Sequence, residues 1–476
     1  YNMVFPITGG TQDTGYEVEN SLRFNDDDSA YLTRTNSSGG SRQIFTTSFW
    51  FKRGNIFSGS GVKFFDVGTS TSTDTGRYFI AIDGSARLQV IGGATSYRTT
   101  TQVFRDASAW YHAVVAVDST DGTADNRIKI YVNGNQVTAF DTNNAMTQNQ
   151  NTPVNESSKA HQIGRNQPNT SEYYDGYIAE FHHIDGQQKA QTDFGEFNND
   201  GVWVPKQYTG TYGTNGVFLE FQQTGTSQNS SGIGADTSGN DNHFAVNNFA
   251  ATDVTEDTCT NSFATWNPLD LDLTVTPTLS EGNTQLAQPA SGTSSNCNFG
   301  VSQGKWYFEW KPTDRDNILL SIVPQNLYPA GSNLFTADKT IGIYAGNPNL
   351  YQNGSSQGSL GGGLSNDDIV MYAMDLDNNL LYIGKNGQWN DGLGGGFDQS
   401  DFSNANGFSF NREADAFYVV GTVNGSGSSN YTVQMNFGNP PYAVSSSNND
   451  GKYGNFEYSV PSGYYALCTK RLAEFG

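Results

Sequence analysis

Three acidic residues stand in aromatic-rich segments that are predicted to be strands: Glu180, Glu220 and Glu309. A glycoside hydrolase needs two carboxyl groups that flank the sugar bond, and a strand typically presents such a pair when the acids are two or four residues apart. Each of these glutamates lacks a partner acid at that spacing. The motifs of serine hydrolases and zinc proteases do not occur either. We therefore predict that the chain is not an enzyme.

The pair His182-His183, followed by Asp185, is a further candidate for metal binding or for a catalytic base. Adjacent residues of a strand face opposite sides of the sheet, so at most one of these histidines faces any site. We favour the alternative, in which both are surface or packing residues.

Two acidic turns have the residue types that a calcium ion prefers. Ca²⁺ takes oxygen ligands from carboxylates, amides and backbone carbonyls. The candidate ligands are Asp236, Asn240 and Asp241 in residues 236–242, and Asp118 and Asp121 in residues 118–125. Neither turn has the ligand spacing of an EF-hand loop. The alternative, which we favour, is an Asx-type turn between strands, so Ca²⁺ is the one cofactor that the sequence leaves open.

Several predicted loops combine aromatic rings with amide and acidic side chains. Such loops suit carbohydrate recognition, because a ring packs against the apolar face of a sugar while polar groups bind its hydroxyls. The candidate ligand-binding residues are Tyr97, Tyr173, Tyr174, Tyr344, Asn347, Tyr351 and Trp389. The alternative for each ring is that it caps the hydrophobic core of its own domain.

The elements that must position these residues are clearest in residues 110–137, WYHAVVAVDSTDGTADNRIKIYVNGNQV. Residues 128–132 alternate in the manner of a strand with one buried face. An Asn-Gly pair follows at 133–134 and is typical of a two-residue type I′ hairpin turn. The same plan returns in residues 369–389, with a second Asn-Gly pair at 386–387. Two copies this far apart predict two antiparallel β-sandwich domains.

The composition agrees with this interpretation. Of 476 residues, 54 are Gly, 30 are Phe and 25 are Tyr, a bias that suits strands joined by tight turns. Helical periodicity sustained over three turns is nearly absent from the sequence. The fold class that we predict is all-β, with two antiparallel β-sandwich (jelly-roll) domains in tandem and a β-rich connector between them.

The net charge of −22, from 47 acidic and 25 basic residues, disfavours several classes of partner. It repels phosphate backbones and anionic membrane surfaces, so we predict neither nucleic acid binding nor membrane insertion. The longest apolar run, around residues 113–117, is far shorter than the roughly 20 residues that span a bilayer. No leader peptide is visible, and a chain that begins with Tyr1 is expected to be a fragment or a processed product.

The three cysteines fall singly at Cys259, Cys297 and Cys468. Their spacing indicates neither a zinc site nor a redox dithiol. We predict three buried free thiols, with one disulfide and one free thiol as the alternative.

The motif order resembles two known β-sandwich families. Residues 48–53 (SFWFKR), 110–118, 128–137, 163–165 (IGR) and 174–186 (YDGYIAEFHHIDG) resemble a laminin G-like, concanavalin A-like jelly roll. Residues 304–310 (GKWYFEW), 341–346 (IGIYAG), 367–389 and 417–422 (FYVVGT) are similar to a SPRY domain. The first resemblance implies lectin-like binding, and the second implies a ligand surface built from loops.

The segments between these motifs resemble the connector in structural proteins of tailed bacteriophages. They are residues 194–221, 236–242 and 263–270. The domain organisation that follows is an N-terminal arm or linker (1–16), a laminin G-like jelly roll (17–192), a β-rich connector (193–270) and a SPRY-like β-sandwich (271–476).

The function that the resemblance implies is that of a structural virion protein. We expect a tail fibre or other surface appendage of a bacteriophage, located on the virion surface outside the cell, that binds host-surface polysaccharide. Expected partners are other virion structural proteins and further copies of this chain, with a homotrimer favoured. The alternatives are a capsid decoration protein without glycan binding, and a secreted adhesin or polysaccharide depolymerase.

Overall fold

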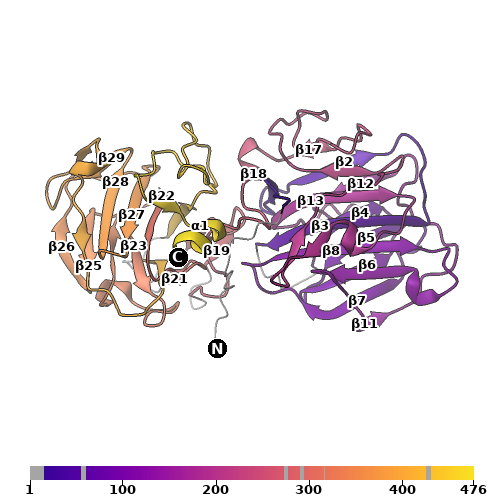
Figure 1. The fold of residues 1–476 in the computed structure, drawn as a ribbon, viewed down its shortest axis with the longest axis horizontal. Helices are drawn as coiled ribbons and strands as arrows, with labels where there is room; N and C mark the ends of the chain where they lie inside the picture. Colours follow the sequence, from indigo (N-terminus) through magenta and orange to yellow (C-terminus); the bar gives the residue numbers. More distant parts are fainter. Residues whose placement is uncertain (1–14, 55–60, 273–276, 290–293, 316, 425–429) are drawn as a thin grey trace. The chain divides into compact units, whose positions relative to one another are not determined.

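The computed structural model describes residues 15–54, 61–272, 277–289, 294–315, 317–424 and 430–476. The described residues divide into two compact units, 15–260 and 261–476, which Figure 1 shows in indigo to magenta and in orange to yellow. Nearly all regular structure is β, and the described residues form a single α-helix, α1 (Thr469–Phe475). The predicted all-β fold class is confirmed.

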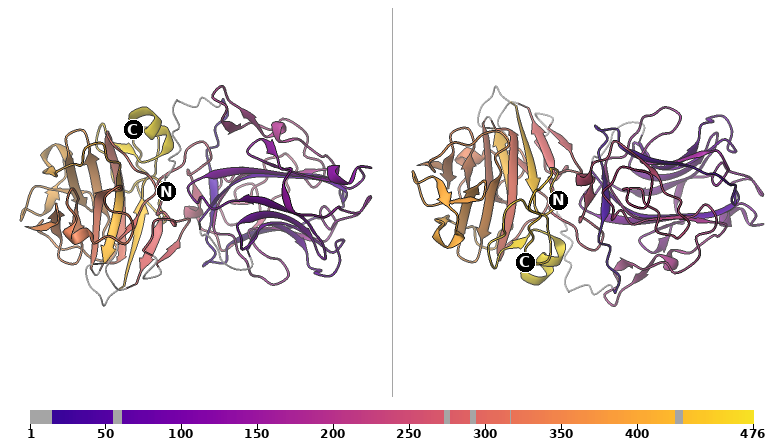
Figure 2. Two further views of the ribbon diagram at one scale, coloured as in Figure 1. Left: turned by 90° about the horizontal axis from the view of Figure 1, so that it is seen from below. Right: turned by 90° about the horizontal axis from the view of Figure 1, so that it is seen from above.

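The first unit is a jelly roll whose strands stack in layers (Figure 2). Sheet 1 has the strand order β10 (Asn135–Gln136), β9 (Ile128–Val132), β8 (Trp110–Asp118), β3 (Ile44–Arg53), β13 (Gly176–Asp185), β1 (Ser21–Phe24) and β18 (Val254–Thr255), with β16 (Val217–Leu219) also paired to β13. Sheet 2 has the order β11 (Phe140–Asn143), β7 (Ser96–Val103), β6 (Arg87–Gly92), β5 (Arg77–Ile82), β4 (Val62–Gly68), β12 (Ala160–Ile163), β2 (Tyr31–Thr35) and β17 (Ala245–Asn247).

The core of this unit lies between the two sheets and is rich in aromatic rings. Phe49 of β3 packs against Phe64 of β4 at 4.9 Å between ring centroids and against Phe181 of β13 at 5.9 Å. The turn from β9 to β10 has positive φ at Asn133 (45°) and Gly134 (80°), as a type I′ turn requires. The predicted hairpin turn is therefore confirmed.

The outer face of sheet 1 is covered by residues that follow the jelly roll in the chain. A small hairpin, β14 (Gly195–Phe197) and β15 (Trp203–Pro205), begins this cover. Trp203 packs against Trp50 and Ala179 of the sheet, and an added Cβ at Gly134 would lie 2.2 Å from the Trp203 ring. Side chains from residues 193–221 thus form a second hydrophobic layer on this face.

The second unit is another sandwich of two sheets. Sheet 3 has the order β19 (Thr278–Ser280), β20 (Gln285–Gln288), β33 (Tyr431–Asn436), β22 (Lys305–Asp314), β27 (Val370–Asp375), β28 (Leu380–Lys385), β29 (Gln388–Asn390) and β30 (Phe397–Gln399), with β31 (Phe408–Ser409) on β28 and β34 (Tyr465–Ala466) on β22. Sheet 4 has the order β21 (Ser295–Asn296), β32 (Tyr418–Asn424), β23 (Ile318–Pro324), β24 (Ile341–Tyr344), β25 (Asn349–Gln352) and β26 (Ser355–Ser359). Short 3₁₀ turns link strands at Ala124–Asn126, Gln191–Asp193, Ala251–Asp253, Leu334–Thr336 and Phe402–Asn404.

Strand β22 shows how the second unit is built. Trp306, Phe308 and Trp310 alternate into the core between the sheets, while Tyr307 and Glu309 face outward. That outward face of sheet 3 is covered by the segment before α1, whose Phe456 ring lies 5.0 Å from Tyr307. The turn from β28 to β29 again has positive φ at both Asn and Gly, so the second predicted Asn-Gly hairpin is also confirmed.

Further predictions concern the domain boundaries, the N-terminal arm, the cysteines and membrane-spanning segments. The domain boundaries at 192 and 270 stay predictions, although β16, β17 and β18 of the predicted connector pair with strands of the first unit. Residues 1–14 of the predicted N-terminal arm lie outside the described residues. All three cysteines are free; Cys297 and Cys468 are buried as predicted, whereas Cys259 is half-buried. In the part of the chain that the structure describes, no helix is long and apolar enough to cross a membrane.

Three buried histidines of the first unit are held in the neutral form. Trp203 Nε1 donates to His112 Nδ1 at 3.0 Å, so His112 Nε2 carries the proton and donates to Ser48 Oγ at 2.9 Å. This tautomer cannot accept the Ser48 proton, which excludes a serine–histidine nucleophile at this pair. His161 Nε2 accepts from the Asn155 amide, and His183 Nε2 lies 2.9 Å from Asn155 Oδ1. Burial lowers the pKa of His112 and His183 to about 3 and that of His161 to about 4.

These histidines predict that acid destabilises the first unit. An unfolded histidine has a pKa of about 6.5, so between about pH 6.5 and pH 4 the unfolded state binds more protons than the folded state. The stabilisation is complete above about pH 6.5, and below it each histidine removes up to about 1.4 kcal/mol per pH unit. Hydrogen exchange of β13 amides should therefore accelerate from pH 7 to pH 5 after correction for the intrinsic rate.

The variant that tests this assignment is His183→Gln, which removes one of the buried imidazoles and should reduce the pH dependence. Equal pH dependence in the wild type and His183→Gln would contradict the assignment to buried histidine.

Candidate functional site

The outer face of sheet 2 carries polar and charged side chains in the first unit. A bulge in β4, between Lys63 and Phe65, turns both Phe64 and Phe65 into the core and leaves Lys63 and Asp66 facing outward. Strand β5 alternates in the same way, with Arg77 and Phe79 outward and Tyr78 and Ile80 in the core. We call the outward residues and the loop that touches them the sheet 2 face: Tyr31, Lys63, Asp66, Arg77, Phe79, Gln162, Arg165, Asn166, Glu172 and Tyr173.

A hydrogen-bonded chain of alternating charge crosses the sheet 2 face. Arg77 grips Asp66 with two bonds, Nη2 to Oδ2 at 2.6 Å and Nε to Oδ1 at 3.2 Å, and also donates to Asn166 Oδ1 at 3.0 Å. Asn166 in turn donates to Glu172 at 2.5 Å, and the Lys63 ammonium lies 2.7 Å from the same carboxylate oxygen. The side chains of Arg77, Asp66 and Lys63 are 8%, 0% and 7% exposed, and that of Glu172 is 20% exposed, so most of this chain is buried. Because each side chain is held by the next, the chain fixes the positions of the more exposed side chains around it.

Aromatic rings border this chain on both sides. The Arg165 guanidinium lies 3.5 Å from the centre of the Tyr31 ring and donates to Gln162 Oε1 at 2.8 Å. The Tyr173 ring is 6.4 Å from Tyr31, and both rings are half-buried. Half-exposed rings beside fixed polar groups are the arrangement that binds one apolar face and the hydroxyls of a sugar ring.

The electrostatics of the sheet 2 face differ from those of the whole chain. Burial raises the pKa of Asp66, and the two hydrogen bonds and the positive charge of Arg77 oppose that rise. Lys63, Arg77 and Arg165 bring three positive charges to a region with two carboxylates, in a chain whose net charge is −22. The charged side chains of this face therefore do not share the strongly negative balance of the whole chain.

Of the predicted ligand-binding residues in the first unit, Tyr173 lies on the sheet 2 face. Tyr97 and Tyr174 do not, because both rings are part of the core. Tyr97 belongs to β7 rather than to a loop, and the Tyr174 hydroxyl donates to the Lys52 carbonyl at 2.7 Å. Their expected exposure at loop ends was wrong, and the structure offers no exposed ring face at either position.

In the second unit the structure brings three predicted residues together. Tyr344 ends β24, Asn347 is exposed in the following turn, and Tyr351 lies in β25. The two tyrosine rings are 6.1 Å apart, and Phe335 packs edge-on against both. Trp389, by contrast, is buried beneath Phe402 at 4.8 Å, so its ring is also not an exposed face.

The side chains of the first predicted calcium turn, residues 236–242, form hydrogen bonds within the protein. Asp236 accepts four bonds within its own loop and from β16, from Phe218 N, Ser238 N, Ser238 Oγ and Asn242 N. Asn240 Nδ2 donates to the carbonyls of Gly213 and Gly216, whereas Asp241 is exposed. These contacts form the Asx-type turn of the alternative interpretation. They also connect residues 213–218 to the loop 236–242 by hydrogen bonds.

The aspartates of the second predicted calcium turn, residues 118–125, also accept hydrogen bonds from their own turn. Asp118 Oδ1 accepts from the amide and the hydroxyl of Thr120, and Asp121 Oδ1 accepts from the Thr123 amide. Among the described residues, no group of three or more His, Cys, Asp or Glu side chains is placed to hold a metal ion. Calcium binding at either turn stays a prediction.

The predicted carboxylate candidates have structural partners. Glu180 sits in the bulge of β13 at a φ of 49°, accepts a hydrogen bond from Tyr16 Oη at 2.9 Å, and lies 3.5 Å from His182 Nε2. Glu220 is half-buried, and Glu309 belongs to the other unit. His182 faces the cover of sheet 1, where it stacks on Phe218 at 4.2 Å, and His183 faces the core, as the alternation predicts.

Glu309 is the most deeply buried of the three glutamates. Tyr307 Oη and Tyr458 N donate to Oε1, and Asn436 Nδ2 and Glu457 N donate to Oε2, at 2.8–3.1 Å. Burial raises its pKa to about 7, against the opposing effect of these four bonds. The carboxyl group anchors the cover of sheet 3 instead of facing solvent.

The match to a family model agrees with the geometry of the first unit. Residues 25–191 match the model described as the concanavalin A-like lectin/glucanases superfamily. That range runs from the turn before β2 through β13 and so includes most strands of both sheets. The first unit therefore has a concanavalin A-like jelly-roll fold.

Solved structures give likenesses of low identity. The SPRY domain of human HERC1 is 15% identical over 36% of this chain and 96% of its own, with a TM-score of 0.28. A putative carbohydrate-binding protein from Bacteroides ovatus is 14% identical over 49% of this chain and 59% of its own, with a TM-score of 0.34. A heptameric SAP-like pentraxin from Limulus polyphemus is 14% identical over 37% of this chain and 80% of its own, with a TM-score of 0.28. A search of the curated proteins finds no match.

The sequence interpretation missed Asp66, Arg77 and Glu172. A partial signal was present for the first two, because each is a charged residue within or next to a short apolar run, where a charged side chain is expected to point away from the core. Their pairing across β4 and β5 required the register of the two strands, which the sequence does not reveal.

Removing the Glu309 carboxylate should destabilise the second unit. The Glu309→Ala variant leaves the amides of residues 457 and 458 without their acceptor, and a buried unsatisfied donor costs about 1–3 kcal/mol. We expect a loss of about 3 kcal/mol in urea unfolding, with faster hydrogen exchange in residues 445–468. The exposed acid Asp398 provides the control, since Asp398→Asn should change neither quantity. Unchanged exchange in Glu309→Ala would contradict the anchoring role.

Proposed function

We propose that the chain is a carbohydrate-binding protein and that the sheet 2 face of the first unit is its binding surface. The observation that carries this proposal is the contrast between the two outer faces of the jelly roll. Sheet 1 is covered by hydrophobic side chains from residues 193–221, whereas sheet 2 carries a largely buried polar chain beside the half-exposed side chains of Tyr31, Arg165 and Tyr173.

The chemistry of this surface suits recognition rather than hydrolysis. Both carboxylates on it are committed to cations, Asp66 to Arg77 and Glu172 to Lys63. A hydrolase needs one carboxyl that donates a proton to the leaving oxygen and a second that attacks or activates water. Asp66, which is 0% exposed, holds Arg77 in place, whereas the partly exposed Glu172 carboxylate can accept a hydrogen bond from a sugar hydroxyl.

We further propose that the chain acts on the surface of a bacteriophage virion, in a tail fibre or other appendage, and binds host-surface polysaccharide. The order of the sequence motifs and of the connector segments supports this role. Several copies held together would convert weak single sites into firm attachment, so a homo-oligomer, with a trimer favoured, fits the proposal.

The binding experiment uses the purified full chain on an array of bacterial capsular and lipopolysaccharide glycans, followed by titration of the best glycan. We expect saturable binding without release of reducing ends. Tyr173→Ala and Arg165→Ala should each weaken binding about tenfold, or about 1.4 kcal/mol. Because both side chains are half-buried, thermal unfolding should stay close to that of the wild type.

Tyr382→Ala is the matched control, since it removes a half-buried tyrosine from the second unit that is not a candidate ligand-binding residue. It should leave glycan affinity unchanged. No glycan binding, or equal losses in Tyr173→Ala and Tyr382→Ala, would contradict the proposed surface. Electron microscopy of virions labelled with a gold-conjugated antibody against this chain tests its location. Label on the capsid instead of the tail would contradict the tail-fibre role and support that of a capsid decoration protein.

A further inference from the structure

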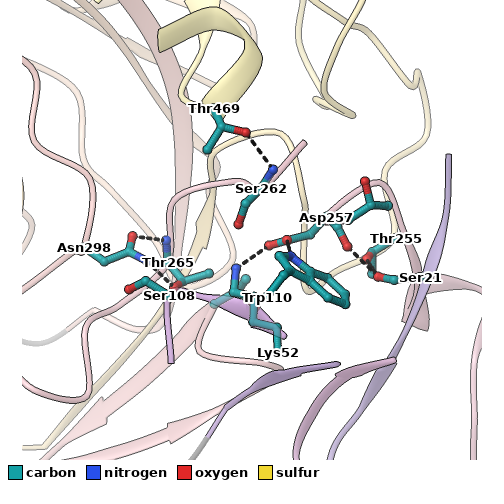
Figure 3. Close-up of polar contacts among 12 residues, drawn as sticks. Ser21, Lys52, Ser108, Trp110, Thr255, Asp257, Ser262, Thr265, Asn298 and Thr469 are labelled. Carbon is teal, nitrogen blue, oxygen red and sulfur yellow. Dashed lines mark hydrogen bonds and ion pairs between the residues drawn. The ribbon is translucent and has the colours of Figure 1, made fainter. Parts of the chain in front are cut away.

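A lysine and an aspartate of the first unit are buried together on the outer face of sheet 1 (Figure 3). Lys52 Nζ lies 2.8 Å from Asp257 Oδ2, and the side chains are 1% and 0% exposed. Lys52 belongs to β3 and Asp257 follows β18, so the contact joins positions 205 residues apart. Lys52 is held by its strand, and Asp257 lies two residues beyond the end of β18.

The surroundings of the pair are aromatic. The strand register places Lys52 between Trp110 of β8 and Tyr177 of β13. The ammonium lies 5.3 Å from the centre of the Tyr177 ring, and the Trp110 and Tyr177 rings are 6.2 Å apart. Two unit charges in such a low-dielectric site have each lost the solvation of water, so the charged pair carries a large desolvation penalty.

The carboxyl group is also oriented. Trp110 Nε1 donates to Asp257 Oδ1 at 3.1 Å, which leaves Oδ2 toward the lysine. Ser21 Oγ donates to the Asp257 carbonyl at 2.6 Å and lies 2.9 Å from Thr255 Oγ1, and these contacts hold the backbone in place. The nitrogen is thus held next to the carboxyl carbon, the arrangement in which proximity accelerates reaction most.

We propose that Lys52 and Asp257 condense to an intramolecular isopeptide bond. In the first step the ammonium passes one proton to Oδ2 along their hydrogen bond, which produces a neutral amine and a carboxylic acid. The amine lone pair then attacks Cγ, and the negative charge that develops on Oδ1 is stabilised by the Trp110 N–H. A second nitrogen proton moves to Oδ2, the Cγ–Oδ2 bond breaks and water leaves.

The atoms balance without any further reactant. Of the three ammonium protons, two depart in the water and one remains on the amide nitrogen. No group is oxidised or reduced. The product is an uncharged amide, so the reaction also removes the two buried charges that burial disfavours.

The bond would close the chain around most of the first unit. Strand β3 lies at the centre of sheet 1, and β18 is its edge strand beside β1. A covalent tie between β3 and the residues after β18 prevents the cover from separating from the sheet under pulling force. This inference does not depend on glycan binding, and its test is independent of that proposal.

The test is mass spectrometry of the full-length wild-type chain. The denatured protein should weigh one water less than its sequence, and a protease digest should contain a branched peptide that joins Lys52 to Asp257. A wild-type chain of full sequence mass, with linear peptides that contain free Lys52 and free Asp257, would overturn the proposal.

One rival reaction also loses water, namely succinimide formation at an Asp-Gly pair such as Asp121-Gly122. Lys52→Met distinguishes the two, because methionine has a similar length and no nucleophilic nitrogen. This variant should have the full sequence mass and no branched peptide. A water loss that persists in Lys52→Met, without a branched peptide in the wild type, would assign the loss to the succinimide and overturn the proposal.

Discussion

The first unit depends on the pairing of polar side chains that lie on the outer face of sheet 1, out of reach of water. A buried polar group without a partner is costly, and neighbouring strands supply only some of the partners on this face, such as Ser48 for His112. The partners come from residues 193–260: Trp203 for His112, Tyr212 for His182 and Asp257 for Lys52. The segment that the sequence suggested as a connector is in this sense the third layer of the jelly roll.

The second unit applies the same principle with a carboxylate. Glu309 stands on the outward face of the central strand β22, and it receives backbone amides from the segment that covers sheet 3. In both units a late part of the chain therefore closes one outer face of the sandwich by hydrogen bonds as well as by hydrophobic contact. In the first unit the other outer face, that of sheet 2, is left for the polar chain that we propose as the binding surface.

The parts of this architecture that depend on local sequence were predictable. Both Asn-Gly turns form hairpins, and residues 128–132 form an alternating strand whose isoleucines face the core, because turn type and side-chain period are local properties. The prediction that only one face of this strand is buried was wrong, since Tyr131 on the other face packs in a buried cluster with Phe194 and Tyr208. The exposure of single aromatics was not predictable. Tyr97 and Tyr174 enter the core because of how distant strands pair, and a lone ring has no local pattern that reveals its direction. The sheet 2 face was missed for the same reason, since Asp66 meets Arg77 only through strand register.

The pairing of β1 with β18 has a consequence for how the protein is made. Leu22 pairs with Val254, so sheet 1 gains its last edge strand only after the more than 200 residues between them have been synthesised. A nascent jelly roll that ends at β13 still lacks core residues such as Leu219, Phe221 and Phe244, and its Trp50 and Lys52 face solvent until residues 193–260 emerge from the ribosome. Contacts of such sequence separation form slowly, and the half-covered sandwich is the species most prone to associate with its neighbours. Several nascent chains that grow close together on one messenger RNA would meet while sheet 1 is still uncovered. The order of synthesis therefore determines how long the first unit can associate with other copies of itself through this face.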